Sequence, residues 1–393
     1  MRIVFFLLSS FLLVSLSCKH NSTSEPYLSI PVIDLDQESF RQVVVDREEG
    51  QYLGHPTTVL LEDGKTILIV YPKGHGKGAI VYKRSTDGGL TWSNRLPIPS
   101  SWETSLEVPT IHRVVDADGK KRLLVFSGLY PARLAHSEDD GLTWSELEPV
   151  GNWGGIVVMA SLIPLNTGKG HYMAMFHDDM RFMTENGEEL FAEDRKMNEQ
   201  ALFTLYKTIS TDGGMTWSYP EPILGRRDMN LCEPGMIRSP DGKKLAVLLR
   251  ENSRGTNSQI IFSDDEGTTW TDPKPLPNEL TGDRHVLKYA PDGRILAVFR
   301  DVPSSGKISP TIGDWVGWVG TWRDLESGGK GQYRIRFRDN RHEWDCCYPG
   351  VELLPDSTFV VTTYGHWEEN AQPYILSVRI TLKELDKKLR NNN

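Results

Sequence analysis

The chain has 393 residues, a formal net charge of −9 and 38% hydrophobic residues, with 11 tryptophans, 35 glycines and 23 prolines. This length suits one large all-β domain or two ordinary domains. The acidity argues against nucleic acid as a partner, because a protein that binds phosphates needs a basic face. The many glycines, prolines and tryptophans favour numerous short strands joined by turns.

The N-terminal segment predicts an export signal and a tether rather than part of the fold. Arg2 precedes an apolar run over residues 3–16, which is too short for a comfortable membrane span. Leu16-Ser17-Cys18 resembles the lipobox of bacterial lipoproteins, although Ser15 stands where leucine is usual. We expect a signal peptide over residues 1–17 and a lipidated tether over residues 18–27. This predicts a lipoprotein of the bacterial cell envelope, on the outer membrane or facing the periplasm. An ordinary secretory signal cut nearby is the alternative.

Three further cysteines do not form a disulfide framework. They are Cys232, Cys346 and Cys347. We expect buried free thiols, with a strained vicinal pair between Cys346 and Cys347 as the alternative.

An eight-residue pattern, Ser-x-Asp-x-Gly-x-Thr-Trp, recurs four times, at residues 85–92, 137–144, 210–217 and 263–270. We expect a hairpin turn in which the Asp accepts backbone N–H bonds, the Gly adopts an unusual backbone conformation, and the Trp packs underneath. The four aspartates are 52, 73 and 53 residues apart. This period suits a repeating unit of four strands.

A second repeat gives the number of units, because each unit has a short opening segment, a turn and a stronger apolar strand. The openings centre on His55, Val108, Met159, Glu233, Arg284 and Tyr348. The apolar strands are expected at residues 66–71, 122–127, 172–176, 245–249, 295–299 and 359–363. Strand material before residue 50 and after residue 372 is expected to complete the last unit. We therefore predict an all-β, six-bladed β-propeller with four Asp-box turns, forming a single domain over residues 28–393. Few windows show a helical period of 3.6 residues, which argues against a helix-rich fold.

The propeller prediction also places a candidate site, because the innermost strands of all blades begin at one mouth of the central channel. The openings bring His55, Glu233, Arg284 and Tyr348 to this mouth. The ends of the second strands bring a further set of polar side chains, namely His177, Arg250, Arg300 and Tyr364. Ionisable residues that converge from separate blades are typical of a substrate site. The alternative is that they satisfy one another across the channel.

The repeated turn resembles the Asp-box, or BNR repeat, of bacterial sialidases (neuraminidases) and related six-bladed propellers. In that family the box lies on the outer rim, so the resemblance implies no catalytic role for it. Glu233-Pro234, followed by an apolar strand and Arg250, is similar to one catalytic motif of the family. Tyr348, six residues before Leu354 and Pro355-Asp356, is similar to another.

The resemblance implies that Tyr348 is the nucleophile and that Glu233 is the carboxylate that activates it. A neutral phenol suits a substrate whose carboxylate would repel an anionic nucleophile. Arg250 matches one arginine that binds this carboxylate, and Arg300 or Arg284 is the candidate for a second.

The chain departs from the family pattern at three places. His55 stands where the first arginine is expected, and Tyr364-Gly365 stands where the glutamate that holds this arginine is expected. The usual acid/base aspartate is absent from residues 72–78, a loop that contains His75. Either His55 or His75 is a candidate to replace it, since histidine exchanges protons near neutral pH.

These observations predict an exo-acting glycoside hydrolase that resembles an exo-α-sialidase and removes a terminal anionic sugar from glycans. The first alternative is a hydrolase or lyase that acts on another acidic sugar, a uronate or another ulosonic acid, with a histidine catalyst. The second alternative is a carbohydrate-binding propeller without catalysis. No cofactor and no metal site are expected, although His177-Asp178-Asp179 contains ligand types. We expect a membrane contact through the lipid anchor alone.

Overall fold

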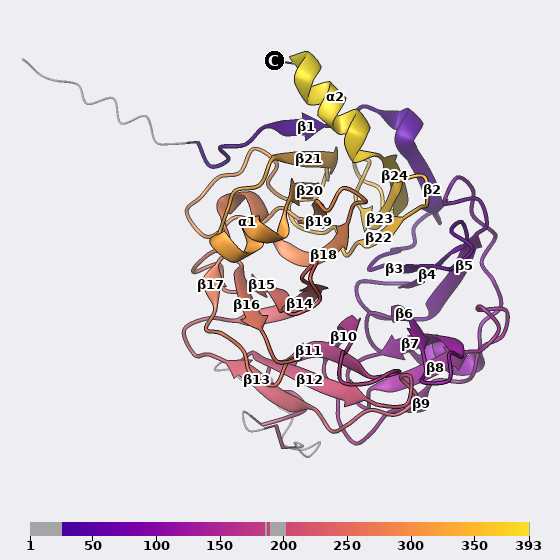
Figure 1. Cartoon of the computed structure of the whole chain (residues 1–393). Helices are drawn as coiled ribbons and strands as arrows, with labels where there is room; N and C mark the ends of the chain where they lie inside the picture. The colour runs from indigo at the N-terminus through magenta and orange to yellow at the C-terminus, as the bar shows by residue number, and fades with distance from the viewer. Residues whose placement is uncertain (1–25, 185–186, 189–201, 393) are drawn as a thin grey trace, which may run out of the picture.

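Six small sheets stand around a central axis like the blades of a propeller (Figure 1). The structure is a computed structural model and describes residues 26–184, 187–188 and 202–392. The predicted six-bladed, all-β fold is confirmed. The expected signal peptide, Cys18 and most of the expected tether lie outside the described residues.

The first four blades follow the chain in order, and their antiparallel strands run outward from the channel. Blade one contains β3 (Thr57–Leu60), β4 (Ile67–Pro72) and β5 (Ile80–Ser85). Blade two contains β6 (Thr110–Val115), β7 (Lys121–Ser127), β8 (Arg133–Ser137) and β9 (Glu148–Pro149). Blade three contains β10 (Ile156–Pro164), β11 (Tyr172–Asp178), β12 (Thr204–Ser210) and β13 (Glu221–Gly225). Blade four contains β14 (Leu231–Arg238), β15 (Leu245–Glu251), β16 (Gln259–Ser263) and β17 (Lys274–Pro275).

The last two blades each take a strand from the beginning of the described chain. Blade five contains β18 (Asp283–Tyr289), β19 (Ile295–Arg300), β20 (Trp315–Gly320) and β21 (Tyr333–Arg338), and β1 (Val32–Asp34) pairs in parallel with β21. Blade six contains β22 (Gly350–Leu353), β23 (Phe359–Gly365), β24 (Tyr374–Ile380) and β2 (Gln42–Asp46). The indigo β2 lies beside the yellow β24 in Figure 1. The expected ring closure is therefore confirmed.

Two helices that the sequence analysis did not predict are α1 (Trp322–Ser327) and α2 (Leu382–Asn392). A reciprocal capping box between Thr321 and Asp324 begins α1. The helix α2 is amphipathic, and its Leu382 and Leu385 side chains join the core that blades five and six share. Within the described residues, no helix is long and apolar enough to cross a bilayer.

The second strand of each blade reads as an unbroken apolar run because both faces of a sheet are covered by neighbouring blades. In β4, Leu68 and Val70 pack against side chains of blade two. Ile69 and Tyr71, which point to the opposite face, pack with Tyr364 of blade six. Burial on both faces fixes the angle between blades and places the ends of the second strands around the channel.

The four Asp-box turns share one set of hydrogen bonds. In the third copy, the Ser210 hydroxyl donates to Asp212 at 2.8 Å, and the Asp212 carboxylate accepts from the Thr216 hydroxyl at 2.6 Å. The other copies repeat these bonds within 0.1 Å. Each box begins on the last residue of a third strand. Since neighbouring strands are antiparallel, the boxes lie at the opposite end of the blades from the ends of the second strands.

The three remaining cysteines are buried free thiols. This agrees with the expectation and argues against a vicinal disulfide between Cys346 and Cys347.

Candidate active site

The inner strands begin with an unusual backbone conformation that aims side chains into the channel. His55, Met159, Glu233 and Arg284 have φ angles of 54°, 53°, 50° and 56°. The strand register shifts between Cys232 and Gly235 and again between Asp283 and Val286. A positive φ costs free energy in a residue that carries a Cβ. The positive φ recurs at the equivalent position in four blades, and in three of them the strand register shifts there, as in a β-bulge that redirects side chains.

Tyr348, Glu233 and Arg250 form the centre of the site. The Tyr348 hydroxyl donates a hydrogen bond to Glu233 Oε1, and Arg250 Nη1 donates to the same oxygen at 2.8 Å. Burial opposes ionisation of Glu233, but the charge of Arg250 holds the pKa of this carboxyl below its usual value. Burial, and then the charge of Glu233, raise the pKa of Tyr348 well above its usual value. A neutral phenol therefore lies against an ionised carboxylate, which suits proton transfer between them.

A buried carboxylate that the sequence analysis missed, Asp283, joins the predicted arginines. Arg300 Nε donates to Asp283 Oδ2 at 3.2 Å, and Arg250 Nε lies 3.4 Å from Asp283 Oδ1. Arg254 forms a further ion pair with Asp283, with its Nη2 2.8 Å from Oδ2. Burial opposes ionisation of Asp283, but Arg250, Arg300 and Arg254 hold its pKa well below the usual value. Its ionised carboxylate fixes the positions of these guanidinium groups.

Arg284 lies apart from this cluster. Its Nη2 donates to the carbonyl of Ala160 at 2.9 Å, and its guanidinium carbon lies 5.8 Å from the centre of the Tyr348 ring. Its Nη1 is buried and has no hydrogen-bond partner among the described residues. Three guanidinium groups thus pair with Glu233 or Asp283, and Arg284 adds a fourth nearby.

A second group of predicted residues lies on the other side of Tyr348. The His55 ring is centred 4.4 Å from the Tyr348 ring, 4.6 Å from the Tyr364 ring and 4.8 Å from the His75 ring. His55 Nε2 and Tyr364 Oη are 3.2 Å apart. This pair occupies the positions at which the sialidase pattern has an arginine and a glutamate. Burial, and then the neighbouring His75, lower the pKa of His55 well below its usual value.

His177 and His75 differ in exposure. His177 is 3% exposed, stacks on Phe203, and accepts a 3.5 Å hydrogen bond at Nδ1 from the backbone N–H of Glu233. Burial lowers the pKa of His177 to about 4. The side chain of His75 is 54% exposed. Of these two histidines, His75 is the one that solvent can reach. Together with the contacts described above, this places all nine predicted side chains at one end of the channel.

Asp345 is the most connected residue that the sequence analysis missed. It accepts hydrogen bonds from Tyr52 at 2.9 Å and from Tyr364 at 3.1 Å, and His366 Nε2 lies 3.1 Å from its second oxygen. Asp345 stands three residues before Tyr348, and Asp283 directly precedes Arg284. Both carboxylates are close in sequence to a predicted site residue, and this closeness is the signal that could have identified them.

Blade two contributes a carboxyl group in place of the predicted apolar residue. Glu107, directly before Val108, is buried and accepts the backbone N–H of Val157 at 2.8 Å. Burial raises the pKa of Glu107 to about 8. The sequence repeat was correct for this blade, but the ionisable side chain lies one residue earlier.

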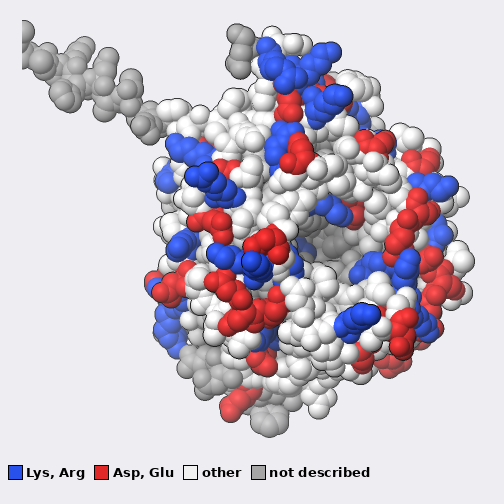
Figure 2. Space-filling model, in the orientation of Figure 1, with Lys and Arg blue, Asp and Glu red and all other residues white. Residues whose placement is uncertain are grey.

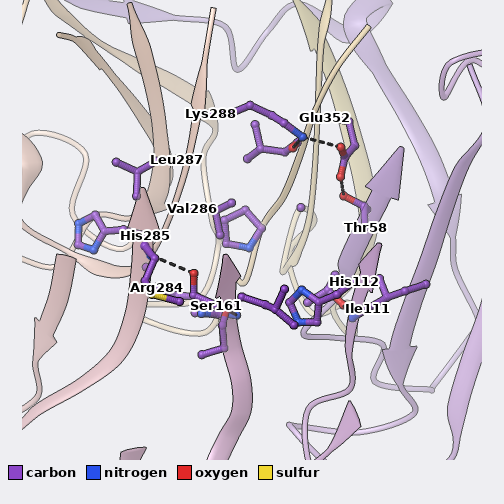
Figure 3. Close-up of a pocket in the computed structure, with 18 residues that line it drawn as sticks. Thr58, Ile111, His112, Ser161, Arg284, His285, Val286, Leu287, Lys288 and Glu352 are labelled. Carbon is purple, nitrogen blue, oxygen red and sulfur yellow. Dashed lines mark hydrogen bonds and ion pairs between the residues drawn. The ribbon is translucent and has the colours of Figure 1, made fainter. Parts of the chain in front are cut away.

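Further along the channel, the same inner strands line a cavity of about 260 Å³. Figure 2 shows a hollow near the centre of the face at which this part of the channel opens. In Figure 3, Lys288 and Glu352 point toward each other, with 2.7 Å between Nζ and Oε2, and Thr58 donates to the other oxygen of Glu352. Arg284 both lines this cavity and faces the ring of Tyr348, so it separates the cavity from the candidate site.

A metal centre needs several ligand side chains in one place. In the part of the chain that the structure describes, no group of three or more His, Cys, Asp or Glu side chains is arranged to hold a metal ion. Asp178 instead accepts the backbone N–H groups of Phe182 and Met183.

Comparison with known proteins adds to this geometry. Residues 34–224 match the BNR repeat-like domain, and this region contains three of the four Asp-boxes. This part of the chain therefore resembles BNR-repeat proteins, and the whole described chain folds as a six-bladed β-propeller. No curated protein matches its sequence.

Several solved structures share the fold of this six-bladed propeller. A protein of unknown function from Dyadobacter fermentans matches with a TM-score of 0.63 and 16% identity, over 86% of this chain and 97% of its own. An α-L-arabinofuranosidase from Fusarium graminearum matches with a TM-score of 0.59 and 12% identity, over 88% and 98%. An intramolecular trans-sialidase from Ruminococcus gnavus matches with a TM-score of 0.58 and 14% identity, over 85% and 95%. At these identities the likeness shows the fold alone.

Proposed function

We propose that this six-bladed propeller is an exo-acting glycoside hydrolase that removes a terminal anionic sugar from glycans. The observation that carries the proposal is the hydrogen bond from the Tyr348 hydroxyl to Glu233, beside the arginine cluster. The similar structures support a glycan substrate, since they include a trans-sialidase and an arabinofuranosidase.

In the proposed first step, the Tyr348 oxygen attacks the anomeric carbon while its proton passes to Glu233. Because Glu233 is ionised and in contact with the phenol, this transfer needs no rearrangement of the protein. The bond to the leaving oxygen breaks as the bond to Tyr348 forms, which gives a covalent glycosyl–tyrosine intermediate. Water then releases the sugar with net retention, and Tyr348 recovers its proton from Glu233.

The charge balance supports an anionic substrate. Four guanidinium groups lie near three ionised carboxylates, those of Glu233, Asp283 and Asp345. Asp283 orients Arg250 and Arg300. A carboxylate of the substrate would complete the pairing of these donors by bidentate hydrogen bonds. Sialic acid is the proposed sugar because Tyr348, Glu233 and Arg250 all match the sialidase pattern.

A uronate or another ulosonic acid is a second candidate substrate. The His55–Tyr364 pair favours it, since a neutral pair replaces the arginine and glutamate of the sialidase pattern. A site that lacks one of the arginines expected to bind the substrate carboxylate suits a sugar that carries its carboxylate at another ring position. Cleavage by elimination, with a histidine as the base, belongs to this candidate.

A panel of glycosides tests the proposal. Purified protein should hydrolyse an α-sialoside or a uronide and release the sugar with retained anomeric configuration, as followed by proton NMR. An unsaturated product would identify a lyase. Turnover of an arabinofuranoside but of no acidic sugar would contradict the anionic substrate. Binding of acidic glycans without turnover would contradict the hydrolase and favour a binding protein.

We also propose that Cys18 is lipidated and that the lipid anchors the protein to the bacterial cell envelope. The support is the sequence Leu16-Ser17-Cys18 after the apolar run. The full-length protein should fractionate with membranes, and a Cys18→Ala variant should move to the soluble fraction. Equal membrane fractionation of both proteins would contradict the anchor.

A further inference from the structure

The hydrogen-bond donors around Asp345 can be assigned from chemistry, because an ionised carboxylate accepts hydrogen bonds and cannot donate them. Burial opposes ionisation of Asp345, but hydrogen bonds from His366, His75 and Tyr52 hold its pKa well below the usual value. Its two oxygens are surrounded by two phenols and two imidazoles. Each neighbouring group must therefore supply the hydrogen of its own contact with Asp345.

Tyr52 and Asp345 together determine which nitrogen of His75 carries a proton, because Nδ1 of His75 also lies 3.3 Å from Oδ1 of Asp345. The Tyr52 hydroxyl lies 2.9 Å and 3.0 Å from the two oxygens of Asp345 and 2.8 Å from Nδ1 of His75. Its single hydrogen points to the carboxylate, so its oxygen accepts from the imidazole. Nδ1 of His75 is then protonated, and in the neutral ring Nε2 carries the lone pair.

The same reasoning gives His55 the opposite tautomer. Tyr364 donates its hydrogen to Asp345 at 3.1 Å, so the Tyr364 oxygen accepts from Nε2 of His55 at 3.2 Å. Nδ1 of His55 accepts the backbone N–H of Gly76 at 3.1 Å. Both nitrogens of His55 are engaged, which leaves no lone pair for a substrate.

His75 differs from His55 in the atom that it leaves free. Its Nδ1 faces Tyr52 and Asp345, and its Nε2 has no hydrogen-bond partner among the described residues. The ring is half exposed and lies 4.8 Å from the His55 ring, which in turn lies 4.4 Å from the nucleophile candidate Tyr348. The contact between Gly76 and His55 anchors the loop that carries His75.

We propose that His75, through Nε2, is the acid/base group of the site, and that Tyr52, Asp345 and His55 are positioning residues that set its tautomer and its place. This inference rests on the proposed hydrolase function. The arrangement follows the general logic of a histidine whose second nitrogen is held by a carboxylate, here both directly, at 3.3 Å, and through the Tyr52 phenol, at 2.8 Å. The Nδ1–H bond to Tyr52 is present in both protonation states of the ring, so the geometry is retained through the cycle.

The proton balance of this scheme closes over the two steps. In the first step, imidazolium Nε2–H of His75 gives its proton to the glycosidic oxygen as the bond from that oxygen to the anomeric carbon breaks. The leaving alcohol departs neutral, and the sugar is bound to Tyr348. In the second step, neutral Nε2 takes a proton from the attacking water, and the bond from the sugar to Tyr348 breaks. His75 is then protonated again, and Tyr348 regains its own proton from Glu233.

The tautomers can be measured without activity. Long-range proton–nitrogen correlation NMR on histidine-labelled protein should show His75 protonated at Nδ1 and His55 protonated at Nε2. Spectra of His75→Gln and His55→Gln variants assign the two signals by their disappearance. A neutral His75 protonated at Nε2 would overturn the inference.

Kinetics test the acid/base role through the leaving group. His75→Ala should lower kcat about a hundredfold or more for an alkyl glycoside but less than about tenfold for a dinitrophenyl glycoside, which needs no acid. Azide should accelerate the variant on the dinitrophenyl substrate and form a glycosyl azide. Tyr52→Phe should show the same selectivity in weaker form. His171→Gln, in an exposed turn where the ring contacts Thr167, lies outside this network and should not.

Failure of the acid/base assignment can be distinguished from failure of the proposed hydrolase function. An equal loss for both leaving groups in His75→Ala would overturn the acid/base assignment while the hydrolase stands. Absence of turnover by the wild-type protein on any glycoside would remove the proposed function, and the NMR experiment would still decide the tautomer of His75.

Discussion

The Asp-box turns and the side chains around Tyr348 lie at opposite ends of the same blades and are built in opposite ways. Each box is closed by its own hydrogen bonds within one hairpin, and the four copies are alike. At the candidate site no box-like repeat exists, and the bonds join different blades, as from Tyr348 to Glu233 and from His55 to Tyr364. Repetition along this chain specifies the fold, and differences between the repeats specify the chemistry.

The largest effect is expected for the proposed nucleophile, Tyr348. Tyr348→Phe should lower kcat on the order of a thousandfold or more, because the ring still packs but no oxygen remains to attack the sugar. Tyr364→Phe removes a phenol of the same site that the proposal does not use as a nucleophile, and we expect a much smaller loss. Steady-state kinetics on the best substrate of the panel measures both. Equal losses would contradict the assignment of Tyr348.

The second expected effect is on stability, at the carboxylate that joins the arginines. Asp283→Asn should lower the free energy of unfolding by about 3–5 kcal/mol, because it leaves buried guanidinium groups without their counter-charge. Urea denaturation followed by tryptophan fluorescence measures this change. Asp228→Asn breaks the exposed pair with Arg226 and serves as the control, for which no measurable change is expected. A similar midpoint for both variants would contradict the role of Asp283.

The third effect depends on pH and concerns Glu107. Its pKa in the folded protein is raised to about 8, so between about pH 4.5 and 8 the carboxyl is neutral when folded and ionised when unfolded. The unfolded state therefore gains stability as pH rises through this window. Glu107→Gln should unfold near the wild-type temperature at pH 5 and at a higher temperature than wild type at pH 8. Parallel melting curves across this range would contradict the raised pKa.

The smallest effect is expected at the boxes. Asp212→Ala removes the acceptor of the Thr216 hydroxyl and N–H bonds and should cost about 1–2 kcal/mol of unfolding free energy, with kcat unchanged. Thr211→Ala, at the variable and exposed position of the same box, is the matched control and should change neither quantity. A loss of turnover in Asp212→Ala at full folding would show that the rim and the site are coupled.

The fold was predictable because its two repeats are local in sequence. The openings and apolar strands recur in a recognisable order along the sequence. The observed second strands agree with the predicted ones to within one or two residues at each end, and those of blades four and five extend far enough to include Arg250 and Arg300. Strand material before residue 50 was predicted for the last blade, but the pairing of β1 with blade five was not, nor was the helix α2, since each occurs once and depends on packing against an existing blade.

The candidate site was predictable in part, for a different reason. Tyr348 and Glu233 stand at equivalent positions of the repeat and match the sialidase pattern. The roles of Tyr52 and Asp345 follow from one contact between residues 293 positions apart, in irregular segments without a repeat. The choice between His55 and His75 could not be made from the sequence, because it depends on which nitrogen of each ring already has a hydrogen-bond partner in the structure.

Covalent trapping tests the central claim most directly. A fluorinated, activated derivative of the preferred acidic sugar should react with the protein, form the intermediate and hydrolyse slowly. Intact-mass and peptide mass spectrometry should then find one sugar per chain, attached to the peptide that contains Tyr348, and no adduct in Tyr348→Phe. An adduct on Glu233 or on another residue, or rapid turnover without any adduct, would contradict the glycosyl–tyrosine mechanism.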